Sequence, residues 1–488
     1  MEIRINIKAV KRALVLLLSI TCLSSNTLWG QENLGLYYFN AVPVSARLNP
    51  AAAFDYKGYF GGLIIPLSGQ IPPPLNIGFT NNSFSFSDIF YKPGGVYGDS
   101  LVLVFHDSIQ GRNFADGLKS VIRFDLNTYI DLFHLGFRTN NIFWHFSVVE
   151  KIEAGVGMPR DLIRLPLYGN ANFPDPYINL SGFGARAIHY REYGFGAAIE
   201  INPDFIIGGK AKMLFGKANI DMPKTDMKWE TDPVTSNFRI LGDFDINLTQ
   251  PILDIRDIRW DSQGDSLVFD KDEKDFLPVD YMLNGKNLGM AIDLGVSYSP
   301  LDKLKLHASI TDLGFISWKK DVTNIKAKGE FNFEGINLED LLDDSVDFGA
   351  LMADSLFRLF NFNVSHQTYR TTVPFNLYLG TNYFLTDNFN VGVMYRGKKW
   401  FEEMISSLTF SLNYNKRGSG AVVTYTLMPD NYNNLGVGFT LKLGGWQTFF
   451  ITDNLLDAIY PQHAREISIR FGTNWVLGRQ KKHASLLQ

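Results

Sequence analysis

The chain has 488 residues, with 46 Lys or Arg against 50 Asp or Glu, so its formal net charge is −4. Nucleic-acid phosphates require a basic field, so this balance excludes a nucleic-acid partner. The only cysteine is Cys22, which excludes a disulfide-stapled fold.

Residues 1–30 have the layout of a secretory signal peptide. Residues 13–20 (ALVLLLSI) form a short apolar core, preceded by a positive region of Arg4, Lys8, Lys11 and Arg12. An apolar core this short cannot cross a hydrocarbon layer about 30 Å thick as a helix. We expect cleavage after Gly30, which leaves 42 basic and 49 acidic side chains, a net charge of −7 and no cysteine.

Two alternatives for this segment stay open. An uncleaved anchor helix is one of them. A lipoprotein modified at Cys22 is the other, but Thr21 stands where a lipobox has Gly, Ala or Ser. Beyond the segment no run of about 18 apolar residues occurs, so we expect no transmembrane helix. An exported chain with 39 Phe and 21 Tyr and no such helix is either a soluble periplasmic protein or a β-barrel.

Residues 45–52 (SARLNPAA) come next and lack the alternation of a strand. Asn49 precedes Pro50, and the residue before a proline is excluded from the helical region, so a turn is expected here. The simplest interpretation is a turn that leads into a strand from Tyr59 to Leu67.

Period-two alternation over segments of about ten residues predicts the fold class. In the last segment, residues 466–478, Ile467, Ile469 and Phe471 fall on one face while Ser468 and Arg470 fall on the other. This pattern is typical of strands in an outer-membrane β-barrel. We predict about fourteen strands: 128–138, 141–153, 181–190, 193–201, 205–218, 288–299, 303–316, 371–384, 389–398, 405–415, 418–427, 433–443, 445–452 and 466–478.

The connections between these strands alternate in length. If the last strand ends in the periplasm, the short periplasmic turns fall at 444–445, 416–418, 386–388, 300–302 and 203–204, and all of them are rich in Gly, Asn, Asp or Pro. Long polar connections near 219–287 and 317–370 then lie outside, as in outer-membrane barrels. The same parity places a predicted short helix at 158–167 on the periplasmic side; the alternatives are that it folds into the lumen or that the count lacks a strand pair. A second predicted helix, 339–360, is expected in an outer loop, with the lumen as the alternative.

Residues 98–101 (GDSL), repeated at 264–267, match the block that opens the GDSL lipases, and Asp131 and His134 match the D-x-x-H that carries their general base. No alternation of strands and helices surrounds either copy, so nothing builds an oxyanion hole at a helix N-terminus. We therefore expect no catalytic residues and no enzyme.

Metal ligands are not indicated either. The eight histidines are scattered singly, without the spacing of a helical metal motif. The acidic stretch 270–275 offers carboxylates for a hard cation, but it lacks the order of an EF-hand loop and is better explained as a solvated outer loop. We expect no metal and no cofactor.

Three segments carry a resemblance to a known family: residues 36–53, 208–220 and 306–318. With the N-P-A segment before a fourteen-strand barrel, the chain resembles an uncharacterised Bacteroidetes outer-membrane family. That family is related to the FadL-like long-chain fatty-acid transporters and the type IX secretion barrels. In FadL-like transporters the segment before the barrel is a hatch, and hydrophobic ligands leave sideways through the wall. The resemblance implies that Arg47, Asn49, Pro50 and Ala51 lie in or beside such a hatch.

The expected organisation is a signal peptide (1–30), a hatch segment (31–57), an all-β transmembrane barrel (58–478) and a polar periplasmic tail (479–488). The expected partner is outer-membrane lipid. The first hypothesis for function is passive uptake of small hydrophobic compounds. The alternative is a structural or secretion-associated barrel that holds a secretion-system or surface protein.

Overall fold

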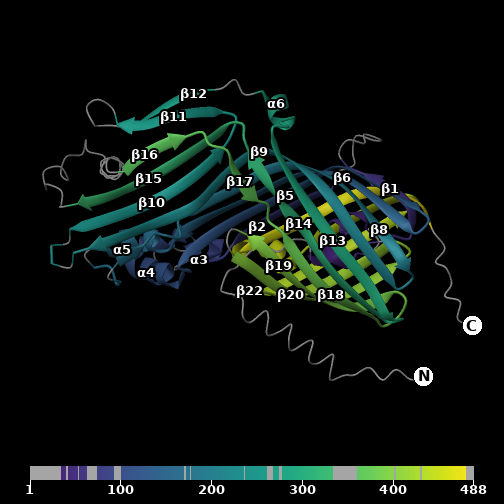
Figure 1. Cartoon of the computed structure of the whole chain (residues 1–488). Helices are drawn as coiled ribbons and strands as arrows, with labels where there is room; N and C mark the ends of the chain where they lie inside the picture. Colours follow the sequence, from purple (N-terminus) through teal and green to yellow (C-terminus); the bar gives the residue numbers. More distant parts are fainter. Residues whose placement is uncertain are drawn as a thin grey trace, which may run out of the picture.

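The chain folds into a closed antiparallel β-barrel with a sheet extension at one end (Figure 1). The computed structural model describes residues 34–39, 42–52, 54–62, 74–92, 100–169, 172–175, 177–232, 234–235, 237–260, 267–273, 277–333, 360–400, 403–428 and 431–479. The predicted signal peptide, the predicted helix at 339–360 and the tail beyond Arg479 lie outside the described residues.

Fourteen strand positions make up the wall. Two of these positions are each filled by two successive strands, β1 with β2 and β17 with β18. The strands are β1 (Tyr56–Gly61), β2 (Leu75–Asn81), β5 (Val121–Thr139), β6 (Ile142–Pro159), β8 (Gly184–Asn202), β9 (Phe205–Thr231), β13 (Asn287–Leu301), β14 (Leu304–Trp318), β17 (Tyr369–Thr372), β18 (Asn376–Phe384), β19 (Phe389–Trp400), β20 (Glu403–Lys416), β21 (Ser419–Met428), β22 (Asn431–Leu443), β23 (Trp446–Thr452) and β24 (Glu466–Arg479). The barrel closes because β1 and β2 pair with β24 on one side and with β5 on the other. The predicted barrel of about fourteen strands is confirmed.

The short turns gather at one end of the barrel, which we call the turn end, and the long connections at the other, the loop end. The two predicted strands 181–190 and 193–201 are in fact one strand, β8. Counting them as two strands exchanged the turn end and the loop end for every connection upstream. The placement of residues 158–167 on the turn side was therefore wrong, because β6 runs from the turn at Asn140 to Pro159 and delivers α5 (Asp161–Tyr168) to the loop end.

The loop end carries a second layer of strands (Figure 1). Residues 205–216 of β9 pair with β13 in the barrel, whereas residues 219–231 leave the barrel and pair with β10. This extension sheet continues in the order β9, β10, β15 and β16. Its strands, with the short strands of the outer connections, are β10 (Phe238–Thr249), β15 (Val322–Phe333), β16 (Phe360–Ser365), β3 (Phe90–Tyr91), β4 (Val102–Leu103), β7 (Tyr177–Asn179), β11 (Leu253–Trp260) and β12 (Leu267–Glu273).

Within the ranges that the structure describes, helices are short and few. They are α2 (Leu34–Tyr37), α3 (Phe86–Ile89), α4 (Ser108–Gly117), α5, α6 (Pro278–Met282) and α9 (Leu455–Ile459), with 3-10 turns η1 (Pro43–Arg47), η3 (Val104–His106) and η4 (Pro461–His463). Among the described residues, no helix has the length and apolar character needed to span a membrane.

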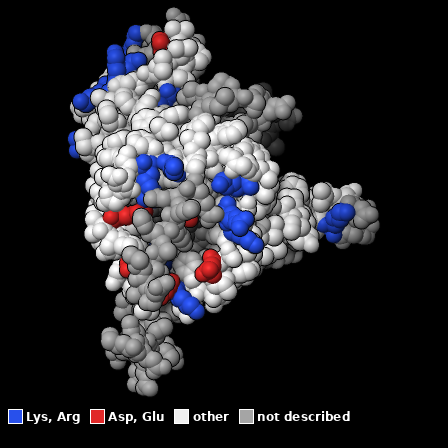
Figure 2. All heavy atoms as spheres, turned by 90° about the vertical axis from the view of Figure 1, so that its right-hand side faces the viewer, with Lys and Arg blue, Asp and Glu red and all other residues white. Residues whose placement is uncertain are grey.

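The outer face of the wall is apolar. Outward-facing side chains that remain exposed come from every part of the wall, for example Phe79, Phe195, Met213, Met290, Leu306, Leu379, Leu412, Phe439 and Ile467. Inward-facing positions on the same strands are polar, such as Asn76, Ser147 and Thr424. This inversion of a soluble protein's pattern is that of an outer-membrane barrel. Figure 2 views the turn end, where Lys and Arg side chains form separate groups over a mostly uncharged surface.

Candidate functional site

One strand position of the wall is interrupted. Gly61, the last residue of β1, lies opposite Asn474 of β24, and Leu75, the first residue of β2, lies opposite Phe471. Only two residues separate those partners along β24. A continuous strand would therefore need two residues between Gly61 and Leu75, but the chain has thirteen, residues 62–74. The chain therefore has eleven residues more at this point than a continuous strand needs.

The neighbouring strand β5 is irregular at the same level. Its pairing register with β6 shifts between Asp131 and Phe133, which marks a β-bulge. Gly62 leaves the ladder with a φ of +116°, a conformation that favours glycine, and an added Cβ would overlap the carbonyl of Leu132. The backbone N–H of Asp131 donates to the carbonyl of Pro74 at 2.9 Å, where the chain returns to the wall.

The described residues of the N-terminal segment, 34–39 and 42–52, occupy the interior of the barrel. The Gly35 N–H donates to Asp453 Oδ1, just beyond β23, at 3.3 Å. The ring of Tyr37 stacks on Tyr378 of β18 with centroids 5.6 Å apart. On the adjacent strand β14, Ser309, which is paired with Tyr378, donates from Oγ to the carbonyl of Leu48 at 2.6 Å. The segment thus contacts the wall on several sides, and we call it the luminal segment.

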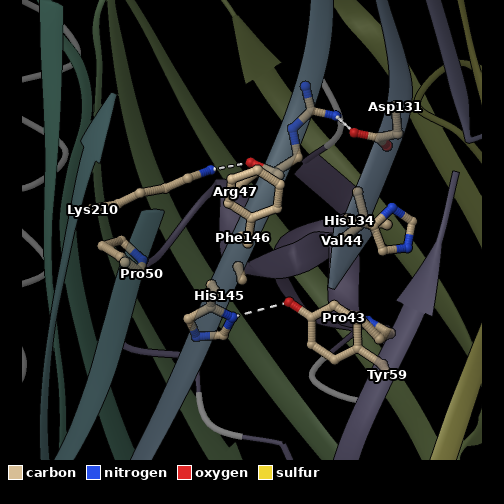
Figure 3. A pocket seen from close by; sticks show the side chains of 13 residues that line it. Pro43, Val44, Arg47, Pro50, Tyr59, Asp131, His134, His145, Phe146 and Lys210 are labelled. Atoms are coloured by element: carbon tan, nitrogen blue, oxygen red, sulfur yellow. Dashed lines mark hydrogen bonds and ion pairs between the residues drawn. The ribbon is translucent and has the colours of Figure 1, made fainter. Parts of the chain in front are cut away.

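An ion pair joins the luminal segment to the irregular part of β5. Arg47 Nη1 lies 2.8 Å from Asp131 Oδ1, and the guanidinium carbon lies 5.5 Å from the centroid of the Tyr129 ring. Arg470 of β24 approaches the same carboxylate, with Nη2 3.9 Å from Asp131 Oδ2. Figure 3 shows Arg47 and Asp131 meeting across the interior. Asp131 is therefore shared by the luminal segment and by the two strands that flank the interruption.

The turn at Asn49 and Pro50 fits against β9 and β13. Asn49 Oδ1 accepts from the N–H of Ala51 at 2.9 Å, which closes the turn, and its Nδ2 donates to the carbonyl of Val296 at 3.4 Å. A Cβ at Gly208 would overlap the backbone of Pro50, and one at Gly295 would overlap the Asn49 amide. Two glycines on adjacent strands, which lack a Cβ, thus leave room for this turn. The turn itself was predictable, but the glycine pair that receives it carries no signal in the sequence.

A small cavity of about 20 Å³ lies beside the interruption. The luminal segment lines it with largely apolar surface: Pro43, Val44, Ala46 and Pro50. The wall contributes polar side chains whose partners are other wall groups. Tyr59 Oη and His145 Nδ1 are 3.0 Å apart, and Lys210 Nζ donates to Ser147 Oγ at 2.7 Å (Figure 3). Tyr59, Lys210 and Ser147 are thereby hydrogen-bonded, and the surface that the cavity exposes is largely apolar.

Buried charges fill the interior further round the wall. Glu192 of β8 lies 2.9 Å from Lys151 and 3.5 Å from Lys212, measured between Oε2 and the Nζ atoms. Lys212 Nζ also lies 2.7 Å from Asp293 and 2.8 Å from Asp312. A second small cavity, of about 30 Å³, borders this network and Arg47. Arg47 therefore stands between an apolar cavity and a charged one.

The residues of the lipase-like motifs do not form a catalytic group. Ser100 is exposed in the loop-end connection before β4, while Asp131 is occupied by arginines and His134 Nε2 lies 2.7 Å from Asn474 Oδ1. Residues 98–99 and 264–266 lie outside the described residues. Within the part of the chain that the structure describes, no group of three or more His, Cys, Asp or Glu is placed to hold a metal ion.

The four residues predicted for a hatch, Arg47, Asn49, Pro50 and Ala51, come together in the interior beside the interruption. Their role as a hatch stays a prediction. The wall partners Asp131, Lys210 and His145 were not identified from the sequence as site residues. Each of them alternates like any polar lumen residue, and only Asp131 lies at the bulge in β5.

A family model described as "Family of unknown function (DUF5723)" matches residues 50–453. A search of curated proteins returned no match. Among solved structures, the chain is similar to the Ralstonia pickettii toluene transporter TbuX, with 8% identity and a TM-score of 0.40, over 89% of this chain and 94% of that one. It is also similar to a Pseudomonas aeruginosa FadL homologue, with 11% identity and a TM-score of 0.35, over 92% and 96%.

Proposed function

The chain belongs to the DUF5723 family, and we propose that it is a passive outer-membrane channel for small hydrophobic compounds, which leave through the wall at the interruption between β1 and β2. The observation that carries the proposal is the coincidence of this interruption with the cavity lined by Pro43, Val44, Ala46 and Pro50. The name of the toluene transporter points to the same class of compound.

The axial route is unfavourable for an apolar guest. The luminal segment fills one side of the interior, and the ions around Glu192 fill the other. A hydrocarbon on that route would separate paired charges from their partners, and uncompensated buried charges are expensive. The surface just outside the interruption is apolar, with Ile77 and Phe79 on β2 and Ile467 on β24 exposed. A sideways step therefore leads from an apolar cavity to lipid.

Arg47 is the group we assign to control of this step. Its ion pair with Asp131 ties the luminal segment to β5 at the bulge, next to the cavity. Shifting Arg47 would widen the apolar cavity toward the interruption. Asp131 would keep Arg470 as a nearby cation, so the carboxylate is not left uncompensated during the shift.

The length of the insertion suggests a direct test. Deletion of residues 63–73 leaves Gly62 and Pro74, the two residues that a continuous strand needs between Gly61 and Leu75. The matched control replaces residues 63–73 by eleven Gly and Ser residues, which alters the sequence but keeps the interruption. Uptake of a radiolabelled monoaromatic hydrocarbon is measured in a Gram-negative host that lacks its own hydrocarbon channels.

We expect the deletion to reduce uptake to the level of the empty host and the Gly-Ser variant to retain most of it. Heat-modifiable migration on gels shows that each barrel has folded. A folded deletion variant that takes up the hydrocarbon at the original rate would contradict exit through the wall.

The alternative function, a barrel that holds a protein partner, is favoured by the extension sheet. This sheet of β9, β10, β15 and β16 stands beyond the membrane-spanning part of the wall, which is more structure than a channel requires. Crosslinking in the native membrane should then trap one defined protein on the extension sheet. Repeated recovery of the barrel alone would count against this function.

A further inference from the structure

A cluster of charged side chains lies on the outer face of the wall, beneath α6. Glu150 of β6 is at its centre. Its carboxylate accepts from Arg191 Nε at 2.8 Å, lies 2.7 Å from His189 Nε2, and pairs with Lys217 Nζ. Lys217 is only 1% exposed and Glu150 4%. We call these four residues the outer-face cluster.

The strand register fixes which side of the wall they occupy. Lys151 points inward, because it pairs with Glu192 and Asp312 in the interior. Its neighbour Glu150 therefore points outward, since successive side chains alternate between faces. Glu150 lies opposite Arg191 in the ladder between β6 and β8, and opposed residues share a face. The cluster thus shares the face of the apolar side chains that contact lipid.

Ionised side chains on the lipid face of a barrel destabilise it, by an amount that grows with depth in the membrane. Here they are covered. Tyr281 of α6 bonds through its hydroxyl to His189 Nδ1, and Met282 places its sulfur 3.5 Å from Lys217 Nζ. Figure 1 shows α6 beside the upper part of β9, where the extension sheet leaves the barrel. Contact with these two side chains keeps the cluster buried.

The other side of the α6 region is uncovered and, apart from the exposed carboxylate of Asp280, apolar. Leu277 is 59% exposed, Val279 65% and Leu283 70%. This surface continues into the outer face of the barrel: Gly285 lies over Phe215 of β9, where an added Cβ would be 3.7 Å from the ring, and Met290 of β13 is exposed below it. The apolar surface of the α6 region and that of the wall are one surface.

We propose that residues 277–285 rest on the acyl chains of the outer leaflet and act as a lipid-facing cover that separates the outer-face cluster from hydrocarbon. The occupant of the exposed apolar surface is bilayer lipid, because the surface is continuous with the membrane-facing wall. The hydroxyl of Tyr281 bonds inward to the cluster, whereas Leu277 and Leu283 are exposed on the outside. Lipid requires this arrangement, with apolar side chains toward it and polar groups away from it. This role is independent of what the barrel transports.

Spin-label accessibility tests the proposal on the whole chain in lipid vesicles. With Cys22→Ser in the background, Leu283→Cys introduces one labelling site. Met290→Cys on β13 is the lipid-facing control, and the exposed Val234→Cys between β9 and β10 is the water-facing control. Collision rates of the nitroxide with oxygen, which concentrates in lipid, and with a water-soluble nickel chelate are compared.

We expect the label at Leu283 to behave like the one at Met290, with a ratio of oxygen to nickel collisions several-fold above that at Val234. A ratio equal to that at Val234 would overturn the proposal. A second pair of variants needs no label: Leu283→Asp should lower the denaturant midpoint for unfolding from vesicles more than Val234→Asp does. Equal shifts would contradict a lipid environment at Leu283.

Discussion

The interior of the barrel has two unlike halves. From β5 to β14 the inward side chains include many ionised groups, such as Lys151, Glu192 and Asp312, which pair with one another. From β20 to β23 the buried polar side chains among the described residues are all neutral; they include Asn413, Thr426 and Gln447. Both halves are polar, as a barrel interior should be, but they hold the luminal segment by different forces.

The charged half holds one end of the luminal segment by a specific ion pair, Arg47 with Asp131. The neutral half holds the other end by apolar packing, in which Leu34, Leu36 and Phe39 cluster with Val422 and Ile451. A charged side chain can move from one partner to another with little loss of interaction energy. Apolar side chains in close contact lose that contact when the segment shifts. We infer that the Arg47 end of the luminal segment can move, whereas its Leu36 end is fixed.

The largest effect should come from the charged half. Glu192→Gln removes a carboxylate that lies close to Lys151, Lys210 and Lys212, and leaves buried lysines short of a counter-charge. We expect a loss of about 4 kcal/mol in the free energy of unfolding from lipid vesicles in guanidinium chloride. The matched control is Glu330→Gln in the extension sheet, whose exposed pair with Arg239 is worth at most about 1 kcal/mol. Similar losses for both variants would erase the distinction between buried and exposed ion pairs.

An intermediate effect is expected where the neutral half packs the luminal segment. Leu36→Ala empties a fully buried site next to Val422 and Ile451. Removing a buried leucine side chain costs about 3 kcal/mol when the site does not collapse. The same unfolding measurement checks it, and Leu283→Ala, on the outside, should change little. No loss at Leu36 would mean that the segment is not packed against this half.

The smallest effect should come from the neutral polar ladder. Asn413 Nδ2 donates to Asn390 Oδ1 and to Ser411 Oγ, both at 2.9 Å. After Asn413→Ala, Asn390 Oδ1 still accepts from Asn382 at 2.8 Å, so no acceptor is orphaned there. We expect a loss of about 1 kcal/mol. A loss as large as that of Glu192→Gln would show that the two halves do not differ in energetic character.

The second half of the wall was predictable because its strands follow simple alternation. Residues 389–398, 405–415, 418–427 and 433–443 each correspond to one observed strand, and the turns between them are short and rich in turn-forming residues. In these strands polar residues, most of them neutral, face inward and apolar ones outward, so the period of two is undisturbed.

The first half of the wall was harder to predict because its buried charged residues resemble the charged residues of turns in the sequence. Arg191 and Glu192 fall between the two strands predicted for β8, as adjacent charges often do in a loop. In the structure Arg191 points outward to Glu150 and Glu192 inward to the lysines, so the strand continues through them. Their partners lie on β6 and β9, and a single sequence does not reveal such pairings.

Two further features had no local signal. The extension sheet was read as outer loops, because its strands stand in water and need no apolar face. The first wall strand was expected at 59–67, but it consists of β1 and β2 with an insertion between them. Only the pairing of both pieces with β24 and β5 identifies them as one strand position.

The central claim is that the luminal segment closes the axial path and leaves the wall as the route for apolar compounds. Single-channel conductance in a planar bilayer tests it most directly, with the complete barrel compared against a variant that lacks residues 31–53. The account predicts little ion conductance for the complete barrel and a stepwise, at least several-fold larger conductance after the deletion. Equal conductance of the two proteins would contradict it.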